Sequence, residues 1–259
     1  MRIIKCKDYN EVSEVAAKIV AAQITVKPNC VLGLPTGSTP VKMYKNLIKM
    51  YNRGEISFKE VITFNLDEYY PISRDNEQSY FYFMHDTFFN YIDINREKNV
   101  NILNGEADNV QEECRRYEEA ISKAGGIDLQ VLGIGQNGHI GFNEPADYLE
   151  SNTHVTALTQ STIKANSRFF NDIEDVPKQA LTTGIWTILK SKKIIILASG
   201  KAKAKAKAVK ELLSGKITTQ NPSTMLNGFC QVIVGNFFSI QNNCNNVCTK
   251  FTAFIPRSY

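Results

Sequence analysis

The stretch Leu132-Gly-Ile-Gly-Gln-Asn-Gly-His-Ile-Gly-Phe-Asn-Glu-Pro145 follows a strongly apolar run and holds four glycines, one histidine, two asparagines and one glutamate. This pattern predicts a buried strand that ends in a glycine-rich turn at the rim of a sheet. Because glycine permits close backbone approach, such a turn can place an imidazole and a carboxylate side by side. The stretch therefore predicts an α/β sheet whose rim carries acid–base chemistry on a small polar molecule.

Apolar runs alternate with helical patterns along the chain, without a long linker or an internal repeat. This alternation predicts an α/β fold with a mostly parallel central sheet and helices on both faces. We expect residues 1–259 to form a single domain. The expected strands are Cys30 to Leu34, Val61 to Asn65, Leu129 to Gly133, Lys193 to Ala198 and Cys230 to Val234. The expected helices are Tyr9 to Val26, Thr39 to Arg53, Ser79 to Tyr91, Val110 to Ala124, Pro177 to Leu189 and Lys201 to Ser214.

One segment, Asp147 to Val176, interrupts the alternation with polar and weakly periodic sequence. An excursion of this kind is typical of a cover over a site, and a moving lid is its functional version. We therefore expect a lid at about residues 147–176.

Composition excludes several classes of protein. The hydrophobic share of 43% and the charged share of 22% are those of an ordinary soluble protein. A net charge of +4 is too slight to indicate nucleic acid, but it suits a small anionic substrate. No apolar run approaches the roughly 20 residues of a membrane span, and the start of the chain is too charged for a secretory signal. Six scattered cysteines are typical of free thiols, so we expect a cytoplasmic protein without membrane contact.

The first candidate site loop, Leu34-Pro-Thr-Gly-Ser-Thr-Pro40, follows a strand and opens a helix. Gly37 allows close backbone approach, and Ser38 and Thr39 supply hydroxyls beside the free amides of a helix start, which favour an anion. The Lys-Ser/Thr ending of a nucleotide P-loop is missing, so ATP is disfavoured. The alternative is a capped helix start without a ligand.

The second loop places Asp67 and Glu68 directly after a strand. Because consecutive residues leaving a strand point in different directions, one acid can face a substrate while the other holds the loop. A carboxylate shielded from water is a usable base for a carbon acid. Asp67 and Glu68 are therefore candidates for a base and a substrate contact, against the alternative of a common acidic turn.

The third loop contains His139, with Glu144 placed to bond its ring and Asn137 placed to position the ring or the substrate. An ordinary imidazole titrates near ~6.5, which suits proton movement at a sugar oxygen. His85 and His154 are expected to be structural. One histidine beside one glutamate is too few ligands for a metal, and no histidine lies near Cys244 and Cys248, so neither a metal nor a cofactor is expected.

Two basic residues are candidates for closing the site. Arg168, flanked by aromatics, can grip a phosphate in bidentate fashion, and Lys201 follows a strand at a helix start. The alternative for Arg168 is a surface ion pair.

These motifs resemble the glucosamine-6-phosphate deaminases of the glucosamine/galactosamine-6-phosphate isomerase family. The resemblance runs in order from the N-terminus to about Val209, and it implies a modified Rossmann-like fold and an aldose–ketose isomerisation with loss of ammonia. The segments that carry it are Leu34 to Pro40, Phe64-Asn-Leu-Asp-Glu-Tyr69, Gly133 to Pro145, Asn166-Ser-Arg-Phe-Phe170 and Pro177-Lys-Gln-Ala-Leu-Thr182.

The resemblance implies a role for each site residue. His139, assisted by Glu144 and Asn137, would open the pyranose ring, and Asp67 would move the proton from C2 to C1. The phosphate would be held by Ser38, Thr39 and nearby amides, with Arg168 and Lys201. Holding the remote phosphate would orient the reacting carbons.

Three departures from the family pattern matter. Some members carry Asp where this chain has Asn137, so the charge partner of the histidine must be Glu144 alone. Allosteric members bind N-acetylglucosamine 6-phosphate through basic residues, whereas Ala146 to Thr156 holds no Lys or Arg, so no such activation is expected. The usual Leu-Gln-x-His appears as Leu226-Asn-Gly-Phe229, and the C-terminal third matches least.

Three other functions compete with this one. A 6-phosphogluconolactonase shares the fold but needs no carbon base, so the loop with Asp67 argues against it. A deaminase/isomerase for galactosamine 6-phosphate differs only in one hydroxyl. A non-catalytic sugar-phosphate sensor usually carries a DNA-binding module, which we do not expect here. The sequence leaves the oligomeric state open between a monomer and a homo-oligomer.

Overall fold

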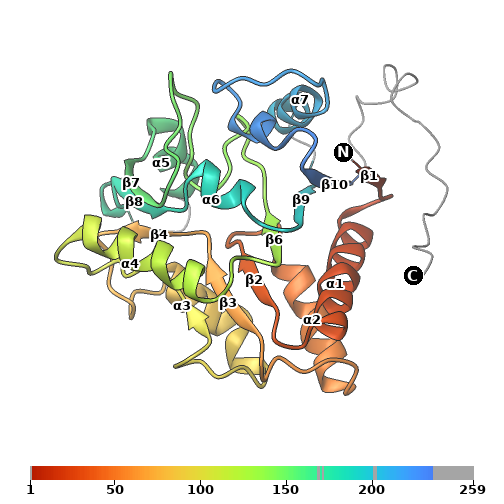
Figure 1. Ribbon diagram of the computed structural model, residues 1–259. Helices are drawn as coiled ribbons and strands as arrows, with labels where there is room; N and C mark the ends of the chain where they lie inside the picture. The colour runs from red at the N-terminus through yellow and green to blue at the C-terminus, as the bar shows by residue number, and fades with distance from the viewer. Residues whose placement is uncertain (1, 168–169, 171, 201–202, 236–259) are drawn as a thin grey trace.

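The computed structural model describes residues 2–167, 170, 172–200 and 203–235. Its central sheet has seven strands, and every pair of neighbours runs parallel. The predicted parallel α/β fold is therefore confirmed (Figure 1). In spatial order the strands are β1 (Arg2–Lys5), β10 (Cys230–Val234), β9 (Ile194–Ala198), β6 (Leu129–Leu132), β2 (Val31–Leu34), β3 (Ile62–Asn65) and β5 (Val100–Asn101).

Helices cover both faces of this sheet. Strand β9 shows why: Ile195 and Leu197 pack into one buried cluster, whereas Ile194 and Ile196 pack into another, as the alternation of strand side chains requires. The first face is covered by α1 (Tyr9–Val26), α2 (Val41–Asn52) and α3 (Tyr80–Thr87). The second is covered by α4 (Val110–Lys123), α6 (Ile185–Leu189) and α7 (Lys203–Leu212).

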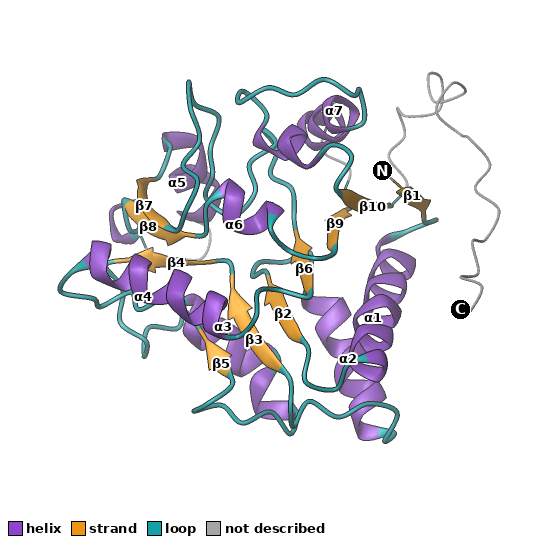
Figure 2. Ribbon diagram, viewed as in Figure 1, coloured by secondary structure: helices purple, strands orange, loops and turns teal. Residues whose placement is uncertain are grey.

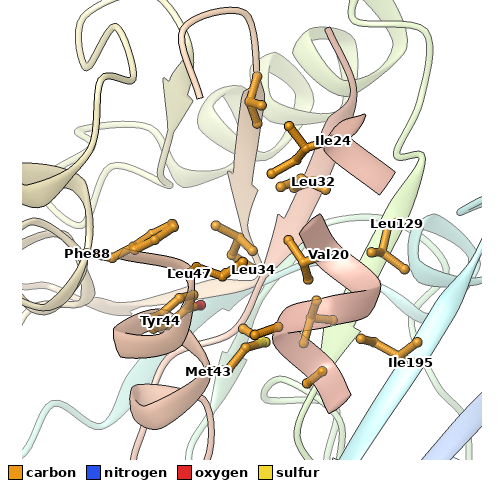
Figure 3. Close-up of a cluster of buried hydrophobic side chains, with 14 of the residues drawn as sticks. Val20, Ile24, Leu32, Leu34, Met43, Tyr44, Leu47, Phe88, Leu129 and Ile195 are labelled. Atoms are coloured by element: carbon orange, nitrogen blue, oxygen red, sulfur yellow. The ribbon is translucent and has the colours of Figure 1, made fainter. Parts of the chain in front are cut away.

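The largest part of the core lies under α1 and α2. Val20 of α1 and Leu47 of α2 point toward Leu34 of β2 and are fully buried, and Tyr44 stacks on Phe88 with ring centroids 4.7 Å apart (Figure 3). This packing fixes β2, whose carboxyl end carries the first candidate loop.

A second, antiparallel sheet lies beside the carboxyl edge of the first (Figure 2). Its strands are β4 (Asp67–Tyr70), β8 (Gln179–Thr182) and β7 (His154–Ala157), in that spatial order.

The predicted helix from Pro177 to Leu189 is wrong, because its first part is β8 and only Ile185–Leu189 is helical. Pairing with β4 and β7 overrides the apolar spacing, and Gly184 caps the helix that follows. Other boundaries differ little: the predicted helix from Ser79 ends at Thr87 and continues as a 3-10 turn, Phe89–Tyr91.

The segment expected to be a lid is folded onto the second sheet. It contains β7, α5 (Gln160–Asn166) and a 3-10 turn, Ile173–Asp175. Leu158 and Ile163 pack against Tyr69 and Phe142, so the segment covers β4 and the loop that follows β6.

No helix in the described ranges is both long and apolar enough to span a bilayer. Four cysteines fall in these ranges, and all four are free and buried: Cys6, Cys30, Cys114 and Cys230.

Candidate active site

The chain reverses its direction of travel across the sheet at β2. From β2 it moves to β3 and β5 on one side, and it then crosses back to β6 on the other. In open parallel sheets, ligands bind outside the carboxyl ends of the strands at such a switch point. The loops after β2 and β6 flank this position, and the junction of β3 with β4 lies beside them.

The loop after β2 has the features of an anion site. Gly37 adopts a φ of 87°, and both Gly37 and Ser38 are exposed, with Thr39 half-buried. Helix α2 begins at Val41 without a cap from the side chain of its N-cap residue, Pro40, and the Lys42 amide donates to the Tyr9 hydroxyl at 3.3 Å. An anion here would bind to the hydroxyls and backbone amides of the loop that precedes the helix. The hydroxyl of Tyr9 donates to the carbonyl of Ser38 at 3.0 Å, and this contact from α1 fixes the loop.

Asp67 is the first residue of β4 and only 6% exposed. Among the described residues, no donor forms a hydrogen bond with its carboxylate. Burial, followed by repulsion from Glu68, raises the pKa of Asp67 from its ordinary 3.8 to about 8. A carboxyl that titrates near neutral pH is suited both to take up and to return a proton.

Glu68 is even more deeply buried, but its two oxygens are occupied. They accept hydrogen bonds of 2.8 to 2.9 Å from the amides of Tyr69, Tyr80 and Phe81, the last two at the start of α3. Burial raises its pKa to about 7, against the effect of these three amides. In this structure Glu68 holds the loop to the start of α3, whereas no described donor occupies the carboxyl of Asp67. A substrate contact by Glu68 stays a prediction.

The raised pKa of Asp67 has a consequence for stability. Below about pH 4 the carboxyl is protonated in both states, but above it the unfolded chain releases a proton that the folded protein retains up to about pH 8. Relative to Asp67→Asn, the wild type should therefore lose stability by up to about 1.4 kcal/mol per pH unit between those limits. Thermal unfolding of both proteins from pH 4 to 8 measures this difference. A constant difference across the range would contradict the assigned burial, and exposed Asp75→Asn serves as the control.

The loop after β6 brings the three predicted polar residues together. The His139 Nδ1 atom lies 3.2 Å from Oε1 of Glu144, although the contact is not aligned as a hydrogen bond. Asn137 donates from Nδ2 to Oε2 of Glu144 at 2.6 Å. Asn137 is exposed, His139 is about a quarter exposed and Glu144 is buried, so the amide and the imidazole lie toward the solvent above the carboxylate.

Two glycines make this arrangement possible. A Cβ atom on Gly135 would lie 2.3 Å from Nε2 of His139, so only glycine leaves room for the ring. Gly138 has a φ of 86°, and its Cβ atom would lie 1.9 Å from the Asn221 side chain. The amide of Ser223 donates a hydrogen bond to the carbonyl of Gly138, so the 3-10 turn Pro222–Leu226 holds the loop after β6 in place.

The junction of β3 and β4 contacts the loop after β6. Leu66 packs with Ile140, next to His139, and donates its amide to the carbonyl of Leu34 at the end of β2. Thr182, which pairs with Asp67 across the second sheet, accepts a hydrogen bond from the amide of Phe142. These contacts bring the residues before and opposite Asp67 against the loop that bears His139.

Thr162 belongs to the site but was not predicted. Its hydroxyl, from α5, donates to Oε1 of Glu144. The sequence offers only a weak signal, because Thr159 and Thr162 read as an ordinary helix N-terminus.

The remaining candidates are two basic residues and two histidines. Arg168 and Lys201 lie outside the described residues. His85 and His154 each contact a backbone carbonyl through Nδ1, at 2.9 Å, as expected of structural histidines. In the described ranges, no three His, Cys, Asp or Glu side chains gather as metal ligands would.

A parallel Rossmann-like sheet, with a buried carboxylic acid and an imidazole–carboxylate pair at its carboxyl edge, is the arrangement of an α/β enzyme with groups suited to acid–base chemistry. A family model described as glucosamine-6-phosphate isomerases/6-phosphogluconolactonase matches residues 8–234. The chain belongs to this family.

Curated relatives of this chain share one name. Glucosamine-6-phosphate deaminase from Thermoanaerobacter sp. (strain X514) is 59% identical over 87% of this chain and 88% of its own length. The protein of that name from Clostridium perfringens (strain 13 / Type A) is 53% identical, over 90% and 96% respectively.

Solved structures agree with the fold. A monomeric glucosamine-6-phosphate deaminase superposes with a TM-score of 0.87 at 46% identity, over 91% of this chain and 97% of that one. A 6-phosphogluconolactonase from Thermotoga maritima reaches a TM-score of 0.70 at 21% identity, over 91% and 99%, which indicates a shared fold alone.

Proposed function

We propose that this protein converts glucosamine 6-phosphate and water to fructose 6-phosphate and ammonia, in amino sugar catabolism. The observation that carries the proposal is the buried Asp67 carboxyl, without a described hydrogen-bond donor, beside the loop of His139. A lactonase hydrolyses an ester and has no use for such a carbon base. The relatives at 53 to 59% identity support the same reaction.

His139 acts first, on the closed sugar. Its imidazole moves a proton between the C1 hydroxyl and the ring oxygen, so that the C1–O5 bond breaks and an aldehyde forms. Glu144 stabilises the protonated ring, and Asn137 holds the second oxygen of that carboxylate.

Asp67 then acts on the open chain. Its carboxylate removes the proton from C2, and the electron pair forms the C1–C2 double bond of an enolamine while the C1 carbonyl oxygen takes a proton from solvent. The protonated Asp67 returns its proton to C1, which leaves an iminium ion at C2. Water adds to this iminium ion, and ammonia and a proton depart, so that the ketone of fructose 6-phosphate remains.

The phosphate binds at the start of α2. Ser38 and Thr39, with nearby backbone amides of the loop, supply hydrogen-bond donors, and Gly37 leaves the backbone open to the anion. Arg168 and Lys201 complete the set in this proposal. The fixed phosphate holds C1 and C2 against Asp67, so binding energy is used for orientation.

In this proposal the enzyme is cytoplasmic, and residues 1–259 form a single domain. Residues 147–176 act as a lid that closes over the bound sugar. The acidic character of Ala146 to Thr156 argues against activation by N-acetylglucosamine 6-phosphate. The monomeric neighbour at 46% identity supports a monomer.

Purified protein tests the proposal directly when it is offered three substrates in parallel. We expect ammonia release from glucosamine 6-phosphate, slower release from its galactosamine epimer, and no hydrolysis of 6-phosphogluconolactone. Faster release from the epimer would favour the galactosamine 6-phosphate deaminase. Binding of the sugar phosphate without any turnover would favour the sensor.

A further inference from the structure

We propose that Thr162 is a positioning residue, whose hydroxyl holds the Glu144 carboxylate in place for the imidazole of His139. Only the predicted effect on kcat/KM rests on the proposed function. The role of Thr162 would make the His139–Glu144 pair depend on the position of α5, which lies in a different part of the chain.

Each oxygen of Glu144 is held from a different direction. Oε2 accepts from Asn137, within the same loop, at 2.6 Å. Oε1 accepts from Thr162 and lies 3.2 Å from Nδ1 of His139. Without Thr162, Oε1 would keep only the poorly aligned contact with the imidazole, and rotation of the carboxylate about its other bond would be unopposed.

The Thr162 hydroxyl is itself oriented. It accepts a hydrogen bond from the hydroxyl of Thr159 at 3.0 Å, and the Thr162 amide donates to that same Thr159 oxygen at 3.2 Å. A hydroxyl has a single proton to donate, and here it is directed to Glu144. Since Thr159 caps α5, the first turn of this helix fixes the donor.

Helix α5 is anchored by packing next to this hydroxyl. Ile163, the neighbour of Thr162, is buried in a cluster with Tyr69 of β4 and Phe142 of the loop after β6. The rings of Tyr69 and Phe142 are 5.7 Å apart. A displacement of α5 from this cluster would therefore also withdraw the Thr162 hydroxyl from Glu144.

The charge of Glu144 depends on these partners. Burial alone raises the pKa of Glu144, but the adjacent imidazole of His139, followed by the hydrogen bonds from Thr162 and Asn137, lowers it below its ordinary value. Within the described part of the chain, His139 is the titratable side chain in contact with the Glu144 carboxylate. A lost donor must therefore raise the pKa of Glu144.

The test follows the Glu144 carboxyl through a pH titration by carbon NMR of protein labelled at the glutamate side-chain carboxyl. Glu144→Gln assigns the resonance by its disappearance. Thr162→Ala and the near-isosteric Thr162→Val are expected to raise the titration midpoint by about one pH unit, because each removes a hydrogen bond to a charged group. Thr162→Ser, which keeps the hydroxyl, should leave it near the wild-type value.

The matched control is Thr156→Ala, a change on β7; the Thr156 hydroxyl donates to the carbonyl of Ala157 and, among the described residues, does not contact Glu144. Its midpoint should equal that of the wild type. With glucosamine 6-phosphate, the alanine and valine variants should lose about tenfold in kcat/KM at neutral pH, with the acid limb of the pH profile moved upward, and Thr162→Ser should restore both.

An unchanged Glu144 midpoint in Thr162→Val, or a serine variant that behaves like alanine, would overturn the inference. If Thr162→Ala fails to fold, Thr162→Val decides the result because it keeps the shape of the side chain. The titration needs no substrate, so absence of ammonia release by the wild type would reject the proposed function while leaving the role of Thr162 to be decided by NMR.

Discussion

Replacing Asp67 by Asn is expected to lower turnover of glucosamine 6-phosphate by roughly 10²- to 10⁴-fold while substrate binding persists. The amide keeps the size of the side chain but has no basic oxygen for the C2 proton. The 6% exposure of Asp67 admits little water as a substitute base. The phosphate contacts at the start of α2 are untouched, so affinity should change little.

A substrate deuterated at C2 separates binding from chemistry. The wild type should show a primary isotope effect and should release deuterium to water or transfer it to C1, whereas Asp67→Asn should do neither at a measurable rate. Asp75→Asn, the same substitution on an exposed loop residue, should resemble the wild type. Deuterium exchange at an unchanged rate in Asp67→Asn would remove Asp67 from its role as the base.

Replacing Gly135 by Ala is expected to cost about 10²-fold in kcat/KM, the range found when a catalytic acid–base group is misplaced. The added methyl group would lie 2.3 to 2.5 Å from three atoms of the His139 ring, well inside van der Waals contact. The ring is at the partly exposed end of its cluster, so it can swing outward and relieve the clash at the expense of its contact with Glu144. The fold should survive, since Gly135 has no positive φ.

Gly133→Ala is the matched control, two residues earlier in the same loop. A Cβ atom there meets no atom within 4 Å, so activity should stay within about twofold of the wild type. Steady-state kinetics and circular dichroism of both variants make the comparison. Full activity in Gly135→Ala would show that the observed position of the imidazole is not the one that turnover requires.

Local sequence patterns predicted the parallel sheet well. The buried run Cys230 to Val234 coincides with a strand that packs on the core with both faces. The helix from Tyr9 to Val26 was predicted to the residue, because one face of it packs on the core. The strand Gln179–Thr182 was predicted as helix, since its conformation depends on pairing with β4 and β7, which are remote in sequence. The local sequence around Gln179–Thr182 does not show that these residues pair with β4 and β7.

The candidate site likewise has one part that local sequence predicted and another that depends on contacts between remote segments. Asn137, His139 and Glu144 lie within eight residues, so their spacing alone predicted that they meet. The loop-holding bonds of Glu68 and the hydroxyl of Thr162 come from helices that tertiary packing delivers to the site. Sequence reasoning therefore predicted that the three polar residues of the loop meet, and it missed the side chains and amides from elsewhere in the chain that hold Glu144 and Glu68 in place.

A crystal structure with an open-chain amino-alditol phosphate, an analogue that cannot react, tests the central claim most directly. The account predicts that one bound molecule has its C1–C2 end within hydrogen-bond reach of Asp67, its C5 hydroxyl at His139 and its phosphate at Ser38 and Thr39. A ligand that reaches Asp67 and His139 only in two separate cavities, or whose phosphate lies away from the start of α2, would contradict it.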